Sequence, residues 1–255
     1  MTRSFSLVLA GLGAVIVGFG CSDVSGSSGA VLSIQFDSLA APSVVVGDTL
    51  RDTTGTVVTP VVHAFNFDGN EITTATVRYQ SPDSGVKVDS ITGFITADSL
   101  RSTQARIFAT VGSLQAVQRV DVTLRPDAIV AVKAVDTLLY SIVDTTLDVS
   151  PQLRVTLKHG VVPNDSAVKS YIVSYAIVSQ KHPQLGQLVN DIGRASLVDT
   201  TGTDGVAGRA IRLHPLNIQA VNDTIMVAAT ARYHGAPVAG SPVQFTLVLK
   251  PRSSP

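Results

Sequence analysis

Apolar and polar residues alternate in short segments through most of this chain, and this period of two limits its fold more than any other feature. From 119 to 124 the sequence reads Arg-Val-Asp-Val-Thr-Leu, which places Val120 and Val122 on one face. Successive side chains of a strand point to opposite faces, so the pattern predicts a strand with one buried side. The same alternation occurs at 153–158 and 243–248. We expect four side chains to point inward: Val120, Val122, Phe245 and Leu247.

The composition also favours strands over helices. The chain has 255 residues, among them 38 Val and 24 Thr, whose β-branched side chains fit a pleated surface better than a helix. Glu71 is the only Glu and there are six Lys, so two good surface helix formers are scarce. No helical pattern of roughly 10 to 15 residues separates the strand segments, and we therefore predict sandwiches, not a parallel α/β sheet.

The length fits two domains of about 100 residues each. Further strands are expected at 106–111, 170–178, 207–213 and 224–232. The stretch 180–193 has no clear period and is predicted to be a long connection or insertion. Arg125-Pro126-Asp127 interrupts the strand pattern, because proline donates no ladder hydrogen bond and restricts the residue before it. This break predicts a first domain over 31–125 and a second over 126–251.

The first twenty residues have the pattern of a signal peptide. A short cationic start at Arg3 precedes an apolar run over 5–19, and Gly18-Phe19-Gly20 places small residues at alternate positions just before Cys21. The run is shorter than the roughly 20 residues of a membrane-spanning helix, and three glycines weaken it further. We predict a signal peptide over 1–20, and the alternative is a retained transmembrane helix.

Cys21 is the only cysteine, so no internal disulfide and no thiolate metal cluster can form. It is followed by a polar segment rich in Gly and Ser, which we interpret as a flexible tether over 21–30. This arrangement resembles a bacterial lipobox. The resemblance implies that Cys21 is lipid-modified and becomes the mature N-terminus, and that Ser22 is compatible with sorting to an outer membrane. Gly18 and Phe19 differ from the usual lipobox residues, so cleavage without lipidation is the alternative.

Residues 43–124 resemble a bacterial immunoglobulin-like domain of group 2. The likeness rests on Val46-Gly47-Asp48-Thr49, the turn at 68–72, the segment 77–83, the segment 88–95 and the closing strand at 120–122. Tyr79 lies near the position where that family often has tryptophan. The second half is more loosely similar to the group 1, invasin-type repeat through 203–210 and 235–243. The resemblance implies two tandem immunoglobulin-like β-sandwich domains.

The sequence offers no pattern typical of an active site. The five histidines are scattered singly, so they are interpreted as ordinary strand and loop residues instead of zinc ligands: His63, His159, His182, His214 and His234. The oxygen-rich segment 66–71 is interpreted as an Asp-Gly hairpin turn, with a calcium loop as the alternative. Gly202, Gly205 and Gly208 predict a turn before a strand, because no Lys-Ser/Thr pair follows as in a phosphate loop.

The formal net charge is zero and charged residues make up 15% of the chain, which gives no global attraction to nucleic acid. No catalytic, cofactor-binding or metal site is predicted, and the site prediction is lipidation at Cys21. The expected function is that of a non-enzymatic envelope lipoprotein, acting as a spacer, adhesion or assembly module, with a possible protein or glycan partner. The alternative is a soluble periplasmic or secreted binding module for a glycan or protein.

Overall fold

A computed structural model describes residues 29–141, 148–181, 185–214 and 223–252. These residues form strands and turns, and no helix is among them, so the all-β prediction is confirmed. For the same residues, no helix with the length and apolar character of a membrane span is found. The predicted signal peptide, Cys21 and most of the predicted tether lie outside the described residues.

The first sandwich is built on a four-stranded sheet in the order β2-β8-β7-β4. Two shorter pairs, β1 with β3 and β5 with β6, complete it. Its core lies between the layers and contains ten buried aliphatic residues, among them Leu50, Ile95 and Ile107. The strands of this unit are β1 (Ser33–Phe36), β2 (Ser43–Val45), β3 (Val62–Phe65), β4 (Arg78–Gln80), β5 (Val86–Val88), β6 (Ile95–Ala97), β7 (Ala105–Val111) and β8 (Leu114–Thr123).

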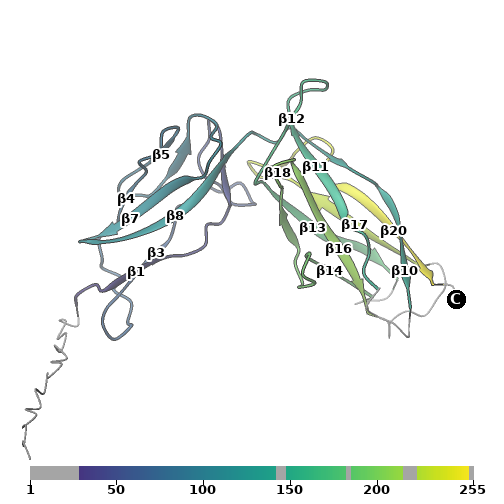
Figure 1. The fold of residues 1–255 in the computed structure, drawn as a ribbon, viewed down its shortest axis with the longest axis horizontal. Coiled ribbons are helices and arrows are strands. Elements are labelled where there is room, and N and C mark those ends of the chain that lie inside the picture. Colours follow the sequence, from purple (N-terminus) through teal and green to yellow (C-terminus); the bar gives the residue numbers. More distant parts are fainter. Residues whose placement is uncertain (1–28, 142–147, 182–184, 215–222, 253–255) are drawn as a thin grey trace, which may run out of the picture.

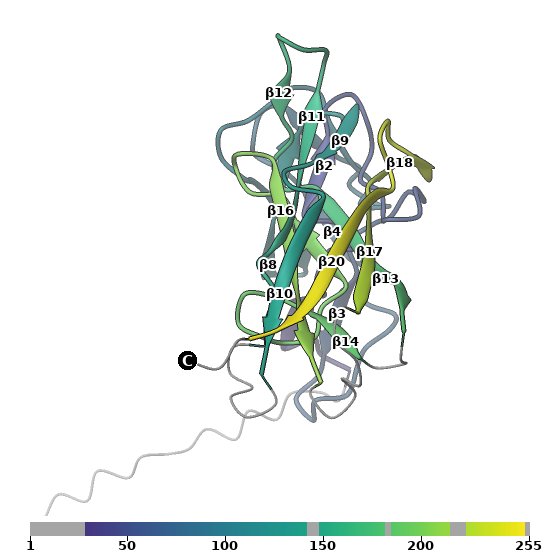
Figure 2. The ribbon, with the colours of Figure 1, turned by 90° about the vertical axis from the view of Figure 1, so that its right-hand side faces the viewer.

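The second sandwich has two fuller sheets, one in the order β10-β20-β17-β13-β15 and one in the order β12-β11-β16-β14, with β9 added beside β11. Figure 2 shows β10, β20, β17 and β13 side by side in one layer. The strands are β9 (Ala128–Ala131), β10 (Val135–Tyr140), β11 (Leu153–His159), β12 (Ser166–Ala167), β13 (Ile172–Gln180), β14 (Gly186–Val189), β15 (Val198–Thr200), β16 (Val206–Leu213), β17 (Thr224–Thr230), β18 (Arg232–Tyr233), β19 (Ala236–Pro237) and β20 (Val243–Pro251).

The predicted register of the long strands is confirmed. Val120 and Val122 in β8, and Phe245 and Leu247 in β20, are all 0% exposed. Arg119, which directly precedes Val120 and points to the opposite face, lies at the surface. A register shift of one residue would move each apolar set to the solvent side, so burial of one face fixes the pairing.

The prediction for 180–193 was wrong in its central part. Instead of an unstructured connection, the chain forms β14 at 186–189, which pairs antiparallel with β16. Leu188 and the preceding Leu185 are buried in the second core. The strand is short, and Gly186 lies so close to Ile211 and Ile225 that a Cβ would meet both within 3 Å. A four-residue strand that starts at a glycine gives too few alternations for a period to be recognised.

Both sandwiches are closed by the same parallel pairing. β2 runs parallel to β8 in the first unit, and β10 runs parallel to β20 in the second. When a strand near the beginning of a domain runs parallel to a strand near its end, the chain runs in the same direction where it enters and where it leaves the domain. The chain therefore enters each sandwich at one end and leaves it at the other.

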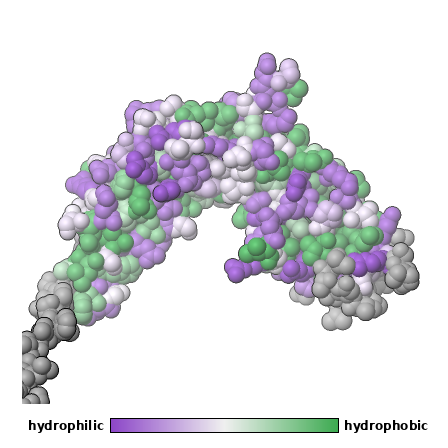
Figure 3. Space-filling model, in the orientation of Figure 1, coloured by the Kyte–Doolittle hydropathy of each residue, from purple (hydrophilic) through white to green (hydrophobic). Residues whose placement is uncertain are grey.

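The two sandwiches meet end to end in a bent arrangement. Figure 1 shows β1 and β3 at the end of the first sandwich away from the second, and β20 ending at the far end of the second. The space-filling view in Figure 3 shows the same arch, with the hollow between the two arms. The described termini thus lie at opposite ends of the molecule.

Candidate functional site

The junction of the two sandwiches begins where β8 ends at Thr123. Leu124 packs against the core of the second sandwich, although it directly follows the last strand of the first. Ile172, at the start of β13, packs in the opposite direction against the core of the first sandwich. Each core is therefore completed by a side chain from the other side of the junction, which joins the two units through apolar contact.

Side chains of the first sandwich hydrogen-bond the segment that precedes β13. The Ser43 hydroxyl donates to the Ser170 carbonyl oxygen at 2.6 Å, and the Thr123 hydroxyl donates to the Lys169 carbonyl oxygen at 2.6 Å. Thr123 is fully buried. In return, the Ser170 hydroxyl lies 3.1 Å from an Asp121 carboxylate oxygen. Buried polar groups need such partners, because an unpaired one costs about 1–3 kcal/mol.

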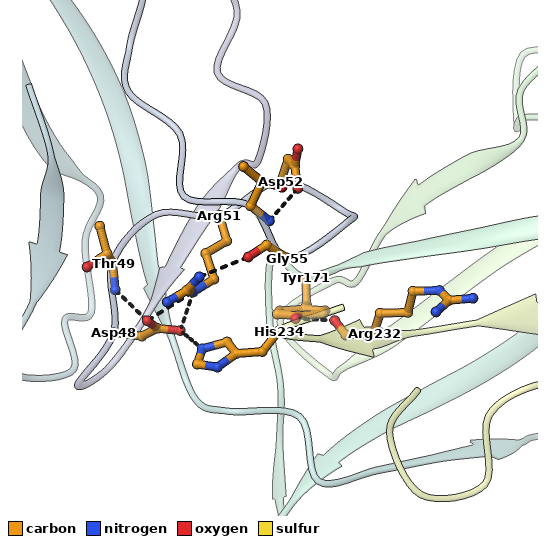
Figure 4. Close-up of polar contacts among 9 residues, drawn as sticks. Asp48, Thr49, Arg51, Asp52, Gly55, Tyr171, Arg232 and His234 are labelled. Carbon is orange, nitrogen blue, oxygen red and sulfur yellow. Dashed lines mark hydrogen bonds and ion pairs between the residues drawn. The ribbon is translucent and has the colours of Figure 1, made fainter. Parts of the chain in front are cut away.

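A second set of contacts centres on Asp48, which lies in the turn after β2. One carboxylate oxygen lies 2.5 Å from His234 Nε2, across 186 residues of sequence. The other accepts the Thr49 backbone N–H at 2.8 Å and the Arg51 Nε at 3.2 Å. Figure 4 shows Asp48 between Thr49, Arg51 and His234, with Tyr171 and Arg232 on the side of the second sandwich. Asp48 thus links the loop of one sandwich to the turn of the other.

Burial by itself would raise the pKa of the Asp48 carboxyl. The hydrogen bonds from His234, from the Thr49 N–H and from Arg51 outweigh this, and they hold the pKa below its usual value. The carboxylate is therefore ionised when it accepts these donors. Charge-assisted hydrogen bonds of this kind are stronger than neutral ones.

The tyrosines beside Asp48 stay neutral. Burial is the main cause that raises the pKa of Tyr171, whose hydroxyl donates to the Arg232 carbonyl oxygen at 2.6 Å. Burial also raises the pKa of Tyr233, and the Asp48 charge adds to this effect. The Tyr233 ring stacks on His234 at 4.1 Å between centroids. These tyrosine side chains pack at the junction, and their hydroxyls serve as hydrogen-bond donors.

The backbones of two turns approach closely at this junction. A Cβ placed on Gly55 would meet Gly235 N at 2.2 Å, and one placed on Gly235 would meet Thr54 O at 2.6 Å. Both glycines also have positive φ. Only glycine allows so close an approach in that conformation.

A cleft of about 510 Å³ lies between the sandwiches beside these contacts. It is lined from the first sandwich by the loop 48–54 and from the second by Tyr171, Tyr233 and His234, among others. The Arg51 guanidinium donates to the Gly55 carbonyl oxygen and the Arg232 guanidinium to the Gly235 carbonyl oxygen, at 2.8 and 2.9 Å. Both arginine guanidinium groups of the cleft are thus hydrogen-bonded to the backbone of the turns that line it.

The structure places the histidines flagged in the sequence at separate positions. His63 in β3 lies between Glu71 and Asp37, at 2.6 and 3.1 Å. His159 lies 2.7 Å from Asp127, and His234 contacts Asp48. His182 and Cys21 lie outside the described residues. Within the described residues, no group of three or more His, Cys, Asp or Glu side chains is arranged to hold a metal ion.

The other two flagged segments form turns. In the 66–71 hairpin, the Asn66 side chain accepts the backbone N–H groups of Asp68 and Asn70, and Gly69 has a positive φ. Gly202 and Gly205 form the turn before β16, where the Gly205 N–H donates to the Gly202 carbonyl oxygen. Both turns match the interpretation from the sequence.

The junction residues were not recognised as a site from the sequence. Asp48 belongs to a segment that resembles a known family, and His234 was interpreted as an ordinary strand or loop histidine. Ser170 and Tyr233 belong to no functional motif. No local signal could have paired Asp48 with His234, because the contact joins two turns that are far apart in the chain. The positive-φ glycines Gly55 and Gly235 are visible in the sequence only as turn residues.

No protein-family profile matches the chain, and no curated protein matches it. Among solved structures, the chain is similar to domains 4 and 5 of the S-layer protein SbsC, with a TM-score of 0.32 and 14% identity over 86% of this chain and 98% of that one. It is also similar to human protocadherin-24 EC1-2, with a TM-score of 0.28 and 13% identity over 88% and 100%.

Proposed function

We propose that this chain is a non-enzymatic lipoprotein of a bacterial cell envelope, in which two immunoglobulin-like β-sandwiches act as a spacer, adhesion or assembly module. The observation that carries the proposal is the parallel pairing of β2 with β8 and of β10 with β20. With entry and exit at opposite ends of each sandwich, the tandem extends away from its N-terminal attachment. The bent pair holds whatever binds at the junction or on the second sandwich at a distance from the membrane.

The attachment is proposed at Cys21, after removal of residues 1–20. Residues 21–30 act as the tether, and the units over 31–125 and 126–251 follow. The first described strand, β1, lies at the end of the first sandwich away from the junction, which is where a membrane anchor must connect if the arms are to project outward. Sorting to the outer membrane through Ser22 is part of the same proposal.

A group 2 immunoglobulin-like assignment of the first sandwich is supported by the packing of Tyr79. Its ring lies against Gly93, where a Cβ would meet three ring atoms at 3.1 to 3.3 Å, and its hydroxyl donates to the Pro60 carbonyl oxygen. Tyr79 is thus half-buried against a turn of the sandwich, and this packing of an aromatic ring near the position of the family's tryptophan supports the proposed assignment. The invasin-type assignment of the second sandwich rests on its sequence alone.

A second candidate function is a soluble periplasmic or secreted module that recognises a glycan or a protein. The cleft of about 510 Å³ between the sandwiches favours it, because ligand sites occur preferentially at domain interfaces. The two candidates differ in the fate of Cys21.

The test is the intact mass of the protein from a bacterial host, after separation of membrane and soluble fractions. We expect a membrane-bound chain that begins at Cys21 and carries the added mass of a diacylglyceryl group. Cys21→Ser should be released or left unprocessed, whereas Ser25→Ala in the same segment should behave as the wild type. An unmodified chain in the soluble fraction would overturn the lipoprotein proposal and favour the soluble module.

A further inference from the structure

Two described residues other than glycine have a left-handed backbone, and both lie at the junction. Ser170 has a φ of 54° and His234 a φ of 51°. Such values are uncommon for residues with a Cβ, and they persist where the surroundings impose them. Ser170 contacts Ser43 and Asp121 of the first sandwich, and His234 contacts Asp48.

We infer that these contacts form a strained latch that fixes the angle between the two sandwiches. The junction latch consists of Ser43, Asp48, Asp121 and Thr123 on the first sandwich and of Lys169, Ser170 and His234 on the second. Contacts from the first sandwich hold Ser170 and His234 in a conformation that these residues leave when the sandwiches separate. The inference deepens the proposed spacer role. It rests on that role only for the functional consequence, which is that the two sandwiches span a fixed distance.

The segment 169–170 makes four hydrogen bonds with the first sandwich. The carbonyl oxygens of Lys169 and Ser170 accept hydrogen bonds from Thr123 and Ser43, and the Ser170 hydroxyl reaches Asp121. The Lys169 ammonium group also donates to the Arg101 carbonyl oxygen at 3.1 Å. These groups leave the segment little freedom to rotate about its own backbone while the sandwiches are in contact.

The turn at 234–235 is held by a different part of the first sandwich. His234 reaches Asp48, and the backbone of Gly235 lies directly against that of Thr54 and Gly55. The two contact areas come from separate strands of the second sandwich, because residue 170 precedes β13 and residue 234 follows β18. Two separate attachment points define an angle, whereas a single point would allow rotation about it.

The covalent connection supports the same conclusion. Asp127 accepts the Arg125 Nε at 2.7 Å and the Gly160 N–H at 2.8 Å, and it lies 2.7 Å from His159 Nδ1. Its own N–H donates to the Lys158 carbonyl oxygen. The linker at 125–127 is thus hydrogen-bonded to the second sandwich, and it does not act as a flexible connection between the two sandwiches. Tandem domains move relative to one another unless their interface prevents it, and here the latch supplies that restraint.

The experiment is a distance distribution between two spin labels on the full-length chain. Cys21→Ser removes the native thiol, and Ser113→Cys and Lys250→Cys place labels at exposed positions near the two far ends. The latch variant combines Ser43→Ala, Thr123→Val and His234→Ala, which removes two donors at the segment 169–170 and the His234 contact at the turn 234–235. The matched control combines Thr110→Val with His63→Ala, two contacts of the same types inside the first sandwich.

We expect one narrow distance in the unaltered chain and in the control, and a distribution about twofold broader or more in the latch variant. His234→Gly alone tests the strain, because glycine keeps the backbone conformation while it loses the Asp48 contact. His234→Gly should broaden the distribution of spin-label distances less than the single variant His234→Ala does. Circular dichroism checks that each variant is folded.

A broad distribution in the unaltered chain would overturn the inference, and so would a narrow one in a folded latch variant. Equal broadening by His234→Gly and His234→Ala would overturn the assignment of strain. None of these outcomes affects the mass and fractionation result at Cys21, so a failure of the latch and a failure of the lipoprotein proposal remain distinguishable.

Discussion

The buried core residues of the first sandwich are all aliphatic, whereas those of the second include Tyr140, Tyr175 and Phe245. Among the described residues, the first core has 10 buried members and the second has 23. Apolar burial contributes roughly 25 cal/mol per Å² to stability, and a large aromatic residue buries about 150–250 Å². The second sandwich should therefore be the more stable of the two, although both are closed by the same parallel pairing.

This difference explains why the junction matters more to the first sandwich. Ile172 of the second sandwich packs against the small first core, and the Thr123 and Ser43 hydroxyls donate hydrogen bonds across the junction. Separation would expose these groups together. We expect unfolding in two steps, with the first sandwich unfolding first, and four predictions test this comparison.

The largest effect is expected from Phe245→Ala in β20. Phe245 is fully buried in the second core, and truncation of a buried Phe costs about 3–5 kcal/mol. In urea denaturation followed by circular dichroism and tyrosine fluorescence, the second transition should move toward the first. The control is Phe67→Ala, because Phe67 is 64% exposed and should change stability by no more than about 0.5 kcal/mol. Similar shifts for the two variants would contradict the assignment of the core.

Ile107→Ala in β7 tests the smaller core. Ile107 is fully buried, and its truncation should cost about 2–5 kcal/mol. Hydrogen exchange read by mass spectrometry should show faster exchange through β7 and β8, with little change in β17 and β20. Val117→Ala in the paired strand is the control, because Val117 is 51% exposed. Equal loss of protection in both sandwiches would show that they unfold as one unit.

Gly93→Ala tests the packing of Tyr79 within the first sandwich. Gly93 has a φ of 76°, and a Cβ would meet the Tyr79 ring at 3.1 Å. Backbone strain and overpacking together should cost about 1–3 kcal/mol in thermal or urea unfolding. Gly112→Ala is the matched control, since Gly112 also has a positive φ but no atom within 4 Å of its added Cβ. The packing argument fails if the control costs as much as Gly93→Ala.

The smallest effect concerns His63, which joins β3 to Glu71 and Asp37. The hydrogen bond to Glu71, followed by that to Asp37, raises the pKa of His63 above its ordinary 6.5. Because the folded-state pKa is the higher one, the extra stability is present below 6.5 and is lost as pH rises through the folded-state pKa. His63→Gln should therefore reduce stability near about pH 5.5 and have little effect at about pH 9.

Glu71→Gln is the control for this pH dependence. It removes the first cause of the raised pKa of His63 while it keeps a hydrogen-bonding side chain. The difference in stability between acidic and alkaline pH should become smaller in this variant. A His63→Gln effect that is equal at both pH values would mean that the charge of His63 does not stabilise the first sandwich.

Strand positions and core faces could be predicted because they depend on local order along the chain. The alternation around Val120 and around Phe245 was enough to predict these strands and their buried faces, since the side chains of a strand with one buried face repeat every two residues. β14 could not be predicted in this way, because its four residues give too few alternations and Gly186 resembles a turn signal. Tertiary packing against Ile211 and Ile225 decides its conformation.

The sequence by itself determined the fold class and the buried faces of the long strands. It also predicts a lipid anchor at Cys21. The tertiary structure decided how the two sandwiches meet. Asp48 and His234 are turn residues 186 positions apart, and the folded structure brings the Asp48 carboxylate to 2.5 Å from His234 Nε2. Ser170 has its left-handed backbone in the same contact area. Strand alternation is a local property, whereas a contact between two turns depends on the placement of every strand between them.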